Sequence, residues 1–270
     1  MTTAISLYKR LLFAGLCLLV TAALPFLANA QTLNDSGLSA LLDEGDGHHQ
    51  RYENQQAIDV YEEAREIAPE AFDVLSRLAE TYNHLGNDFK SNGQKEEAEM
   101  AIRQAVAYAE TMLELFPEEA QTYFLLAATS GNLALFQGGR DKVKTGGGVE
   151  GHCMRGLEID PNHVGLLVAY GVFNREVAGL SWVERTFART FFGAVPKGSM
   201  EQAVEVLTKA TTLDPDHHLA HYELAVTYYA MGQRAEARST FLEVVELPAQ
   251  TSQDIRNRVI AQEMLGRMGS

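Results

Sequence analysis

The sequence predicts an all-α protein, a tandem array of helical hairpins (an α-solenoid) with segments inserted between some of its helices. Two regularities predict this class. A proline ends one helical run and precedes an alanine-rich run at four places: Pro69, Pro117, Pro161 and Pro215. A small residue recurs within the helix after each proline: Ala79, Ala127, Gly171 and Ala225. Prolines stop helices and small residues let helices approach closely, so each unit is expected to be a pair of antiparallel helices.

The last unit has the most regular spacing. When residue 218 is counted as position 1, Ala225, Ala237 and Phe241 fall at positions 8, 20 and 24. This spacing resembles the tetratricopeptide repeat superfamily, whose repeat is about 34 residues long. The small residues of successive units lie 48, 44 and 54 residues apart, which predicts insertions between the two helices of the inner units. A capping helix is expected from about Ser252 to Met268.

A narrower resemblance covers residues 135 to 215. It rests on Gly138, Lys142, Leu180-Ser181-Trp182, Gly198-Ser199, Ala203 and Asp214-Pro215. These residues are similar to the divergent repeat domain that the eukaryotic regulator of microtubule dynamics family shares with periplasmic T-component proteins of bacterial TRAP-type transporters. The resemblance implies binding of a protein partner, such as a solute-binding component of a transporter. In some members it implies handling of a hydrophobic ligand, and it implies neither catalysis nor a cofactor.

Residues 1–30 predict a cleaved signal peptide. Lys9 and Arg10 precede an apolar run, and Ala28-Asn29-Ala30 supplies the small residues of a cleavage site. Retention of this segment as an anchor stays open as the alternative. Residues 31–270 are expected to form one repeat domain. We therefore predict an exported protein, soluble after cleavage, in a bacterial periplasm.

The chain is strongly acidic, with 36 Asp and Glu against 22 Lys and Arg and a formal net charge of -14. Nucleic-acid binding is disfavoured, because phosphate contacts require a basic surface. Beyond the signal segment the single cysteine is Cys153, which excludes an internal disulfide in the mature chain. The sequence around Cys153 reads as the apolar face of a helix, so this thiol is expected to be buried.

In tetratricopeptide arrays the first helix of each pair lines a concave groove, a rule that comes with the resemblance. Applied here, it selects the polar residues Glu80, Asn83, His84, Asn132 and Arg175. It also selects the apolar residues Phe124, Val168, Val172, Tyr222, Val226 and Tyr229. The polar stretch favours a scaffold that binds a protein partner. An exposed apolar stretch would instead suit a carrier that encloses a hydrophobic small molecule or lipid, which is the alternative. A homo-oligomer also stays open.

The segment 180–199 is the most conspicuous insertion. It contains Trp182, the single tryptophan, followed by Phe187, Phe191 and Phe192. These bulky groups are expected to fold back on the array, with Trp182 as the anchor. They would either plug the apolar groove or leave a cavity in it.

Three histidines, His217, His218 and His221, are candidate metal ligands. His217 and His221 lie four residues apart on a predicted helix, a spacing that can share one ion, but a third ligand is not evident. Asp216 is expected to cap this helix.

The glycine-rich segment 138–148 is a candidate phosphate site. It carries Arg140, Lys142 and Lys144 but lacks the Walker pattern. A flexible connection between helices is expected, with a basic contact for an anionic partner as the alternative. Neither a nucleophile motif nor a cysteine with a histidine partner appears. The sequence therefore predicts a protein that is not an enzyme and needs no metal or cofactor.

Overall fold

The structure, a computed structural model, describes residues 36–134, 136, 139–181, 185–186, 189–190 and 198–269. Residues 139–146 are described through their backbone alone. Every regular element in these ranges is an α-helix, as the sequence predicts. Within the described ranges, each helix falls short of the length or the apolar content that crossing a lipid bilayer requires.

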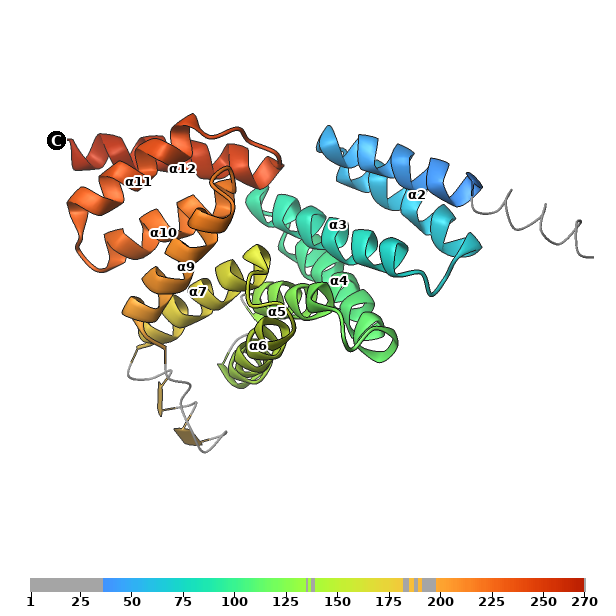
Figure 1. Cartoon of the computed structure of the whole chain (residues 1–270), viewed down its shortest axis with the longest axis horizontal. Helices are drawn as coiled ribbons and strands as arrows, with labels where there is room; N and C mark the ends of the chain where they lie inside the picture. The colour runs from blue at the N-terminus through green and yellow to red at the C-terminus, as the bar shows by residue number, and fades with distance from the viewer. Residues whose placement is uncertain are drawn as a thin grey trace, which may run out of the picture.

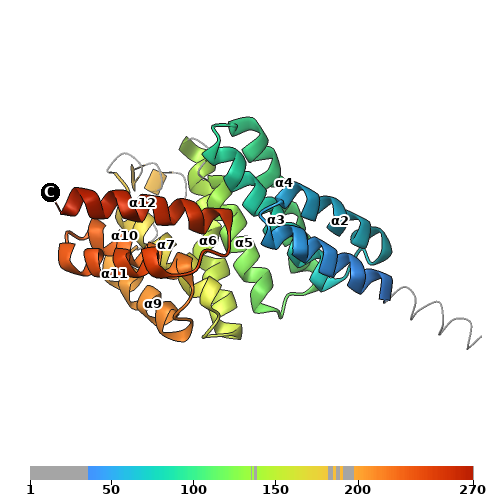
Figure 2. The same ribbon diagram turned by 90° about the horizontal axis from the view of Figure 1, so that it is seen from above.

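Consecutive helices form hairpins that stack into a curved array (Figure 1). The pairs are residues 36–50 with α2 (Asn54–Ile67), α3 (Phe72–Ser91) with α4 (Lys95–Leu115), α5 (Ala120–Ala134) with α6 (Gly139–Ile159), α7 (Val164–Ala178) with α9 (Met200–Leu213), and α10 (His218–Ala230) with α11 (Arg234–Glu246). The last helix, α12 (Ser252–Met268), packs on α10 and α11, and its first turn reaches α3 (Figure 2).

The small residues hold the two helices of a pair close together. A Cβ on Gly171 would lie 2.5 Å from Cγ of Leu207 on the partner helix, which no real side chain tolerates. Gly45 has the same role in the first pair, where a Cβ would clash with the Tyr61 ring. Alanines at the equivalent places, Ala79 and Ala225, are fully buried. The predicted close approach is therefore present in these pairs.

The wide spacing between the second and third pairs has a different cause from the predicted insertion. α3 and α4 contain 20 and 21 residues, against 13 each in α10 and α11. About seven added residues make close to two helical turns. α3 and α4 can therefore each be two turns longer while each keeps the same face toward the core. The connecting turn is unchanged: Gly93 and Gly232 both have a positive φ, of 80° and 76°. In both turns the next residue donates its backbone N–H back to the preceding helix, from Gln94 and Gln233.

The glycine-rich segment is helical, so the prediction of a flexible connection there is wrong. α6 begins at Gly139, and its backbone runs as helix to Ile159. Glycine costs about 1 kcal/mol per residue in a helix interior. Packing opposes that cost, because α6 lies along α5 and buries Val149 and Cys153 in a cluster with Phe173. The side chains of Arg140, Lys142 and Lys144 lie outside the described residues.

A true insertion separates α7 from α9. Trp182 and the phenylalanines that follow it lie outside the described residues, so whether they plug the groove stays a prediction. Arg185 is described, and its guanidinium donates to the carbonyls of Val177 and Ala178 at 3.1 and 2.8 Å. Both carbonyls lie in the last turn of α7, where carbonyls lack an intrahelical partner; the Val177 carbonyl also accepts from the N–H of Leu180. At the other end of the insertion, Ser199 caps α9.

Cys153 is fully buried, as predicted. Burial raises the pKa of its thiol to about 12, so the reactive thiolate is scarce at neutral pH.

Candidate functional site

Most of the predicted polar groove residues bond one repeat to the next. Asn132 on α5 donates its Nδ2 to Oδ1 of Asn83 on α3 at 2.8 Å. Arg175 on α7 donates to Oε2 of Glu223 on α10 at 2.5 Å, and both side chains are nearly buried. Although burial opposes the charge, Glu223 keeps this guanidinium charged, with its pKa raised above the ordinary value. Arg175 is expected from the repeat pattern to face a partner, but it is committed to its neighbour within the array.

The predicted apolar stretch is largely core. Val168 is 4% exposed and packs against Leu207 and Leu224, so its assignment to the groove surface is wrong. Val168 lies on the face of α7 that packs against α9 and α10. Four more residues of the predicted apolar stretch are partly buried and pack against the core clusters: Phe124, Val172, Tyr222 and Val226. Tyr229 is 39% exposed. These side chains do not form a continuous exposed apolar surface.

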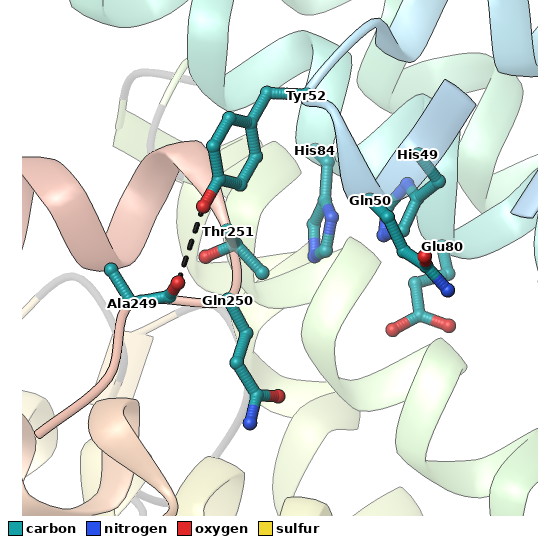
Figure 3. A pocket seen from close by; sticks show the side chains of 8 residues that line it. All are labelled: His49, Gln50, Tyr52, Glu80, His84, Ala249, Gln250 and Thr251. Carbon is teal, nitrogen blue, oxygen red and sulfur yellow. Dashed lines mark hydrogen bonds between the residues drawn. The ribbon is translucent and has the colours of Figure 1, made fainter. Parts of the chain in front are cut away.

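A pocket of about 420 Å³ lies where the first two pairs meet the segment between α11 and α12 (Figure 3). Its lining residues are His49, Gln50, Tyr52, Glu80, His84, Ala249, Gln250 and Thr251. They come from three places: the end of the first helix, the middle of α3, and the segment between α11 and α12. The groove prediction contained Glu80 and His84 and missed the other six.

The turn after the first helix places one wall of the pocket. Tyr52 sits at φ 64°, an uncommon conformation for a bulky residue, and its hydroxyl donates to the carbonyl of Ala249 at 3.2 Å. Those two residues are 197 positions apart in the sequence. His48 and Arg51 brace the turn by binding the Glu53 carboxylate, and the His48 hydrogen bond is the main cause that lowers the pKa of Glu53.

The opposite wall is anchored by Asp88 of α3. Its carboxylate accepts hydrogen bonds from Asn54 at 2.7 Å, from Ser252 at 2.6 Å and from Arg256 at 2.8 Å. We call these contacts the Asp88 clasp. The clasp joins the start of α12 to the first two pairs, and so it holds the segment 249–251 over the pocket.

The start of α12 is itself capped. Thr251 accepts from the backbone N–H of Asp254 at 3.1 Å, and the Asp254 carboxylate accepts from the N–H groups of Gln250 and Thr251. This reciprocal capping box fixes the backbone of the pocket wall. The side chains of Gln50 and Gln250 remain exposed at the rim.

The pocket contains an uncommitted carboxylate beside two imidazoles. Glu80 makes no hydrogen bond or ion pair with any residue that the structure describes. His84 and His49 stack with ring centroids 5.1 Å apart and planes inclined by 19°. Burial lowers the pKa of His84, and the neighbouring Glu80 carboxylate opposes part of that shift. His84 is therefore neutral at physiological pH, and the free charge lining the pocket is negative.

The histidines considered as metal ligands have structural roles. The Nδ1 atom of His217 caps α10 by accepting from the N–H of Ala220, so the assignment of that cap to Asp216 is wrong. His221 contacts Glu243 and the carbonyl of Pro215. A group of three or more His, Cys, Asp or Glu arranged to hold a metal ion does not occur in the described part of the chain.

Residues 41–269 match the family model described as Regulator of microtubule dynamics protein 1-3. The chain belongs to the regulator of microtubule dynamics family. Regulator of microtubule dynamics protein 2 of Rattus norvegicus is 24% identical over 226 residues, covering 82% of this chain and 54% of the relative. Protein 1 of Bos taurus is 22% identical and covers 72% of this chain and 61% of the relative. The chain thus spans about half the length of these relatives.

The fold is that of a tetratricopeptide array. A thermophilic TPR protein of Thermus thermophilus superimposes with a TM-score of 0.63 at 18% identity, covering 84% of this chain and 98% of that chain. The predicted repeat fold and the resemblance to the microtubule-regulator family are confirmed. The resemblance to the TRAP T-component proteins is not confirmed by these comparisons.

The predicted location in a bacterial periplasm is wrong. The family members that the chain matches come from Rattus norvegicus, Bos taurus and other eukaryotes, which have no periplasm. The prediction rested on residues 1–30, which lie outside the described residues.

Proposed function

We propose that this chain is a non-enzymatic scaffold whose concave face binds a segment of a protein partner, with the pocket beside Glu80 as the principal contact. One observation carries the proposal. Asn83, Asn132 and Arg175 are satisfied by neighbouring repeats, whereas Glu80 faces an open pocket without a bonded partner among the described residues. A half-buried polar group that the fold leaves uncommitted favours a contact with another molecule.

The repeat fold supports this proposal, because helical arrays present an extended concave surface to their partners. The alternative of a hydrophobic carrier has less support, since Val168 lies in the core and Val172, Tyr222 and Val226 pack against core clusters. No observation favours a transporter component over another protein partner. The proposal therefore commits to a polar docking site.

The family suggests which partners to test first. The relatives are named regulators of microtubule dynamics, and the family match spans every described helical pair. We include microtubules, or proteins bound to them, as candidate partners. Co-sedimentation of the full chain with stabilised microtubules tests this extension, and a chain that stays entirely in the supernatant would contradict direct binding.

The docking site itself can be tested with a random heptapeptide display library and the full chain. Gln250 is exposed at the rim, so Gln250→Trp should fill the pocket without disturbing the core. Gln104→Trp is the matched control, because Gln104 is exposed on α4, away from the pocket.

Peptides selected on the unmodified chain should bind Gln104→Trp equally well and Gln250→Trp at least tenfold more weakly. Selected peptides that bind Gln250→Trp at full strength would refute docking at this site. An absence of selected peptides would count against recognition of an extended segment.

A further inference from the structure

We propose that the pocket receives an arginine side chain of the partner, with its guanidinium bound by Glu80 and packed against the paired imidazoles of His49 and His84. This inference rests on the proposed function and names the chemistry that the site recognises.

The charge of the pocket favours a cation. Glu80 is half-buried and has no hydrogen-bonded or ion-paired partner among the described residues. The arginines near the lining residues in the sequence are already paired: Arg51 binds Glu53, and Arg77 binds Asp46. Arg256 is bound to Asp88 in the clasp. The whole chain carries a formal charge of -14, which attracts a basic segment at long range. A positive side chain entering the pocket would therefore compensate a carboxylate that the fold leaves without a counter-ion.

The shape of the lining favours guanidinium over ammonium. A guanidinium is planar, pairs with a carboxylate through two parallel hydrogen bonds, and stacks on flat rings. His49 and His84 provide a flat, stacked pair of rings beside Glu80. The amide groups of Gln50 and Gln250 at the rim offer further oxygen acceptors for the remaining N–H donors. An ammonium group uses neither the stacking surface nor the planar geometry.

The dimensions agree with one long side chain. A volume of about 420 Å³ lies in the range of sites that enclose a small organic group. The walls come from α3 and from the segment 249–251, so a side chain inserted between them contacts both ends of the array (Figure 3). Binding is therefore coupled to the Asp88 clasp, which positions the second wall.

The test uses heptapeptide pools with random flanks and a fixed central residue, which is arginine, lysine or citrulline. Citrulline keeps the shape of arginine and removes its charge. Fluorescence anisotropy measures binding of each pool to the full chain. The arginine pool is expected to bind at least tenfold more tightly than the citrulline pool and several-fold more tightly than the lysine pool.

Glu80→Gln should abolish the preference for arginine, because it removes the charge and keeps the size of the side chain. Glu70→Gln is the matched control: Glu70 is exposed before α3, so the variant loses the same charge away from the pocket and should keep the preference. Asp88→Asn should weaken arginine binding without altering any residue that touches the guanidinium. Thermal unfolding of each variant verifies the fold, and Gln250→Trp blocks the pocket independently should Glu80→Gln unfold.

The possible results separate the two proposals. Equal binding of the arginine and lysine pools, lost together in Glu80→Gln, would overturn arginine selectivity and leave a general cation site. Equal binding of the arginine and citrulline pools would overturn the cation site altogether. If Gln250→Trp still blocks the pools in that case, the proposed docking site survives; if it does not, both proposals fail.

Discussion

Replacing Asp88 by alanine removes the central acceptor of the clasp between α3 and α12. Asn54, Ser252 and Arg256 each lose a hydrogen bond. Apart from this contact with α3, α12 packs on α10 and α11 at the end of the array, so the loss should appear as local opening of α12 and not as global unfolding.

The size of the effect follows from the burial of each partner. The Asn54 hydrogen bond joins α2 to α3 and stays the same when α12 opens, so it adds nothing to the opening free energy of α12. The side chains of Arg256 and Asp88 are 27% and 21% exposed, so solvent screening limits that ion pair to below about 1 kcal/mol. Ser252 can turn its hydroxyl to water. We therefore expect the opening free energy of α12 to fall by about 1–2 kcal/mol.

Hydrogen exchange read out by mass spectrometry measures this directly. A loss of about 1–2 kcal/mol corresponds to exchange of the α12 amides that is about 5- to 30-fold faster. Asp59→Ala is the control, since Asp59 accepts from the exposed Gln55 within α2 and lies outside the clasp. Unchanged protection of α12 in Asp88→Ala would refute the clasp as the contact that holds this wall of the pocket.

Three further results follow from packing and titration. Gly171→Val should lower the free energy of chemical unfolding by about 1–3 kcal/mol, because the added side chain has no space beside Leu207. Gly131→Ala should raise it by up to about 1 kcal/mol, because nothing lies within 4 Å of the added Cβ. Equal effects of the two would contradict the packing. Burial lowers the pKa values of His163 and His84, so the unfolded chain binds more protons. The contribution of these two histidines to the free energy of unfolding is complete above pH about 6.5 and is lost as the pH falls through their lower folded-state pKa values. A free energy of unfolding that rises on acidification from pH about 6.5 would contradict this contribution. The peptide containing Cys153 should react with a thiol reagent only on the timescale of local unfolding, and labelling within seconds would contradict its burial.

The fold was predictable because its signals are local. Helix ends follow from proline and glycine, and the small residues at position 8 lie within one helical pair. The same repeat numbering, applied to the first unit, places Gly45 at position 8 and Ala57 at position 20. It then puts His49 and Gln50 at positions 12 and 13, which the predicted groove residues Asn83 and His84 hold in the next unit. This part of the pocket was therefore predictable from the sequence.

The rest of the site depends on contacts between distant residues. The hydrogen bond from Tyr52 to Ala249 and the bonds from α12 to Asp88 join parts of the chain that no periodicity connects. Local spacing also could not distinguish longer helices from an insertion, since both move the next small residue by the same amount. Val168 shows a third limit: a groove position in the repeat pattern becomes core where neighbouring helices crowd it.

The most direct test of the docking site is the hydrogen-exchange footprint of a selected arginine-containing heptapeptide on the full chain. The account expects added protection in three segments at once, around residues 45–52, 80–88 and 249–256, and none on the exposed face of α4. Protection confined to α10, or to α4, would contradict the assignment of partner binding to the pocket beside Glu80.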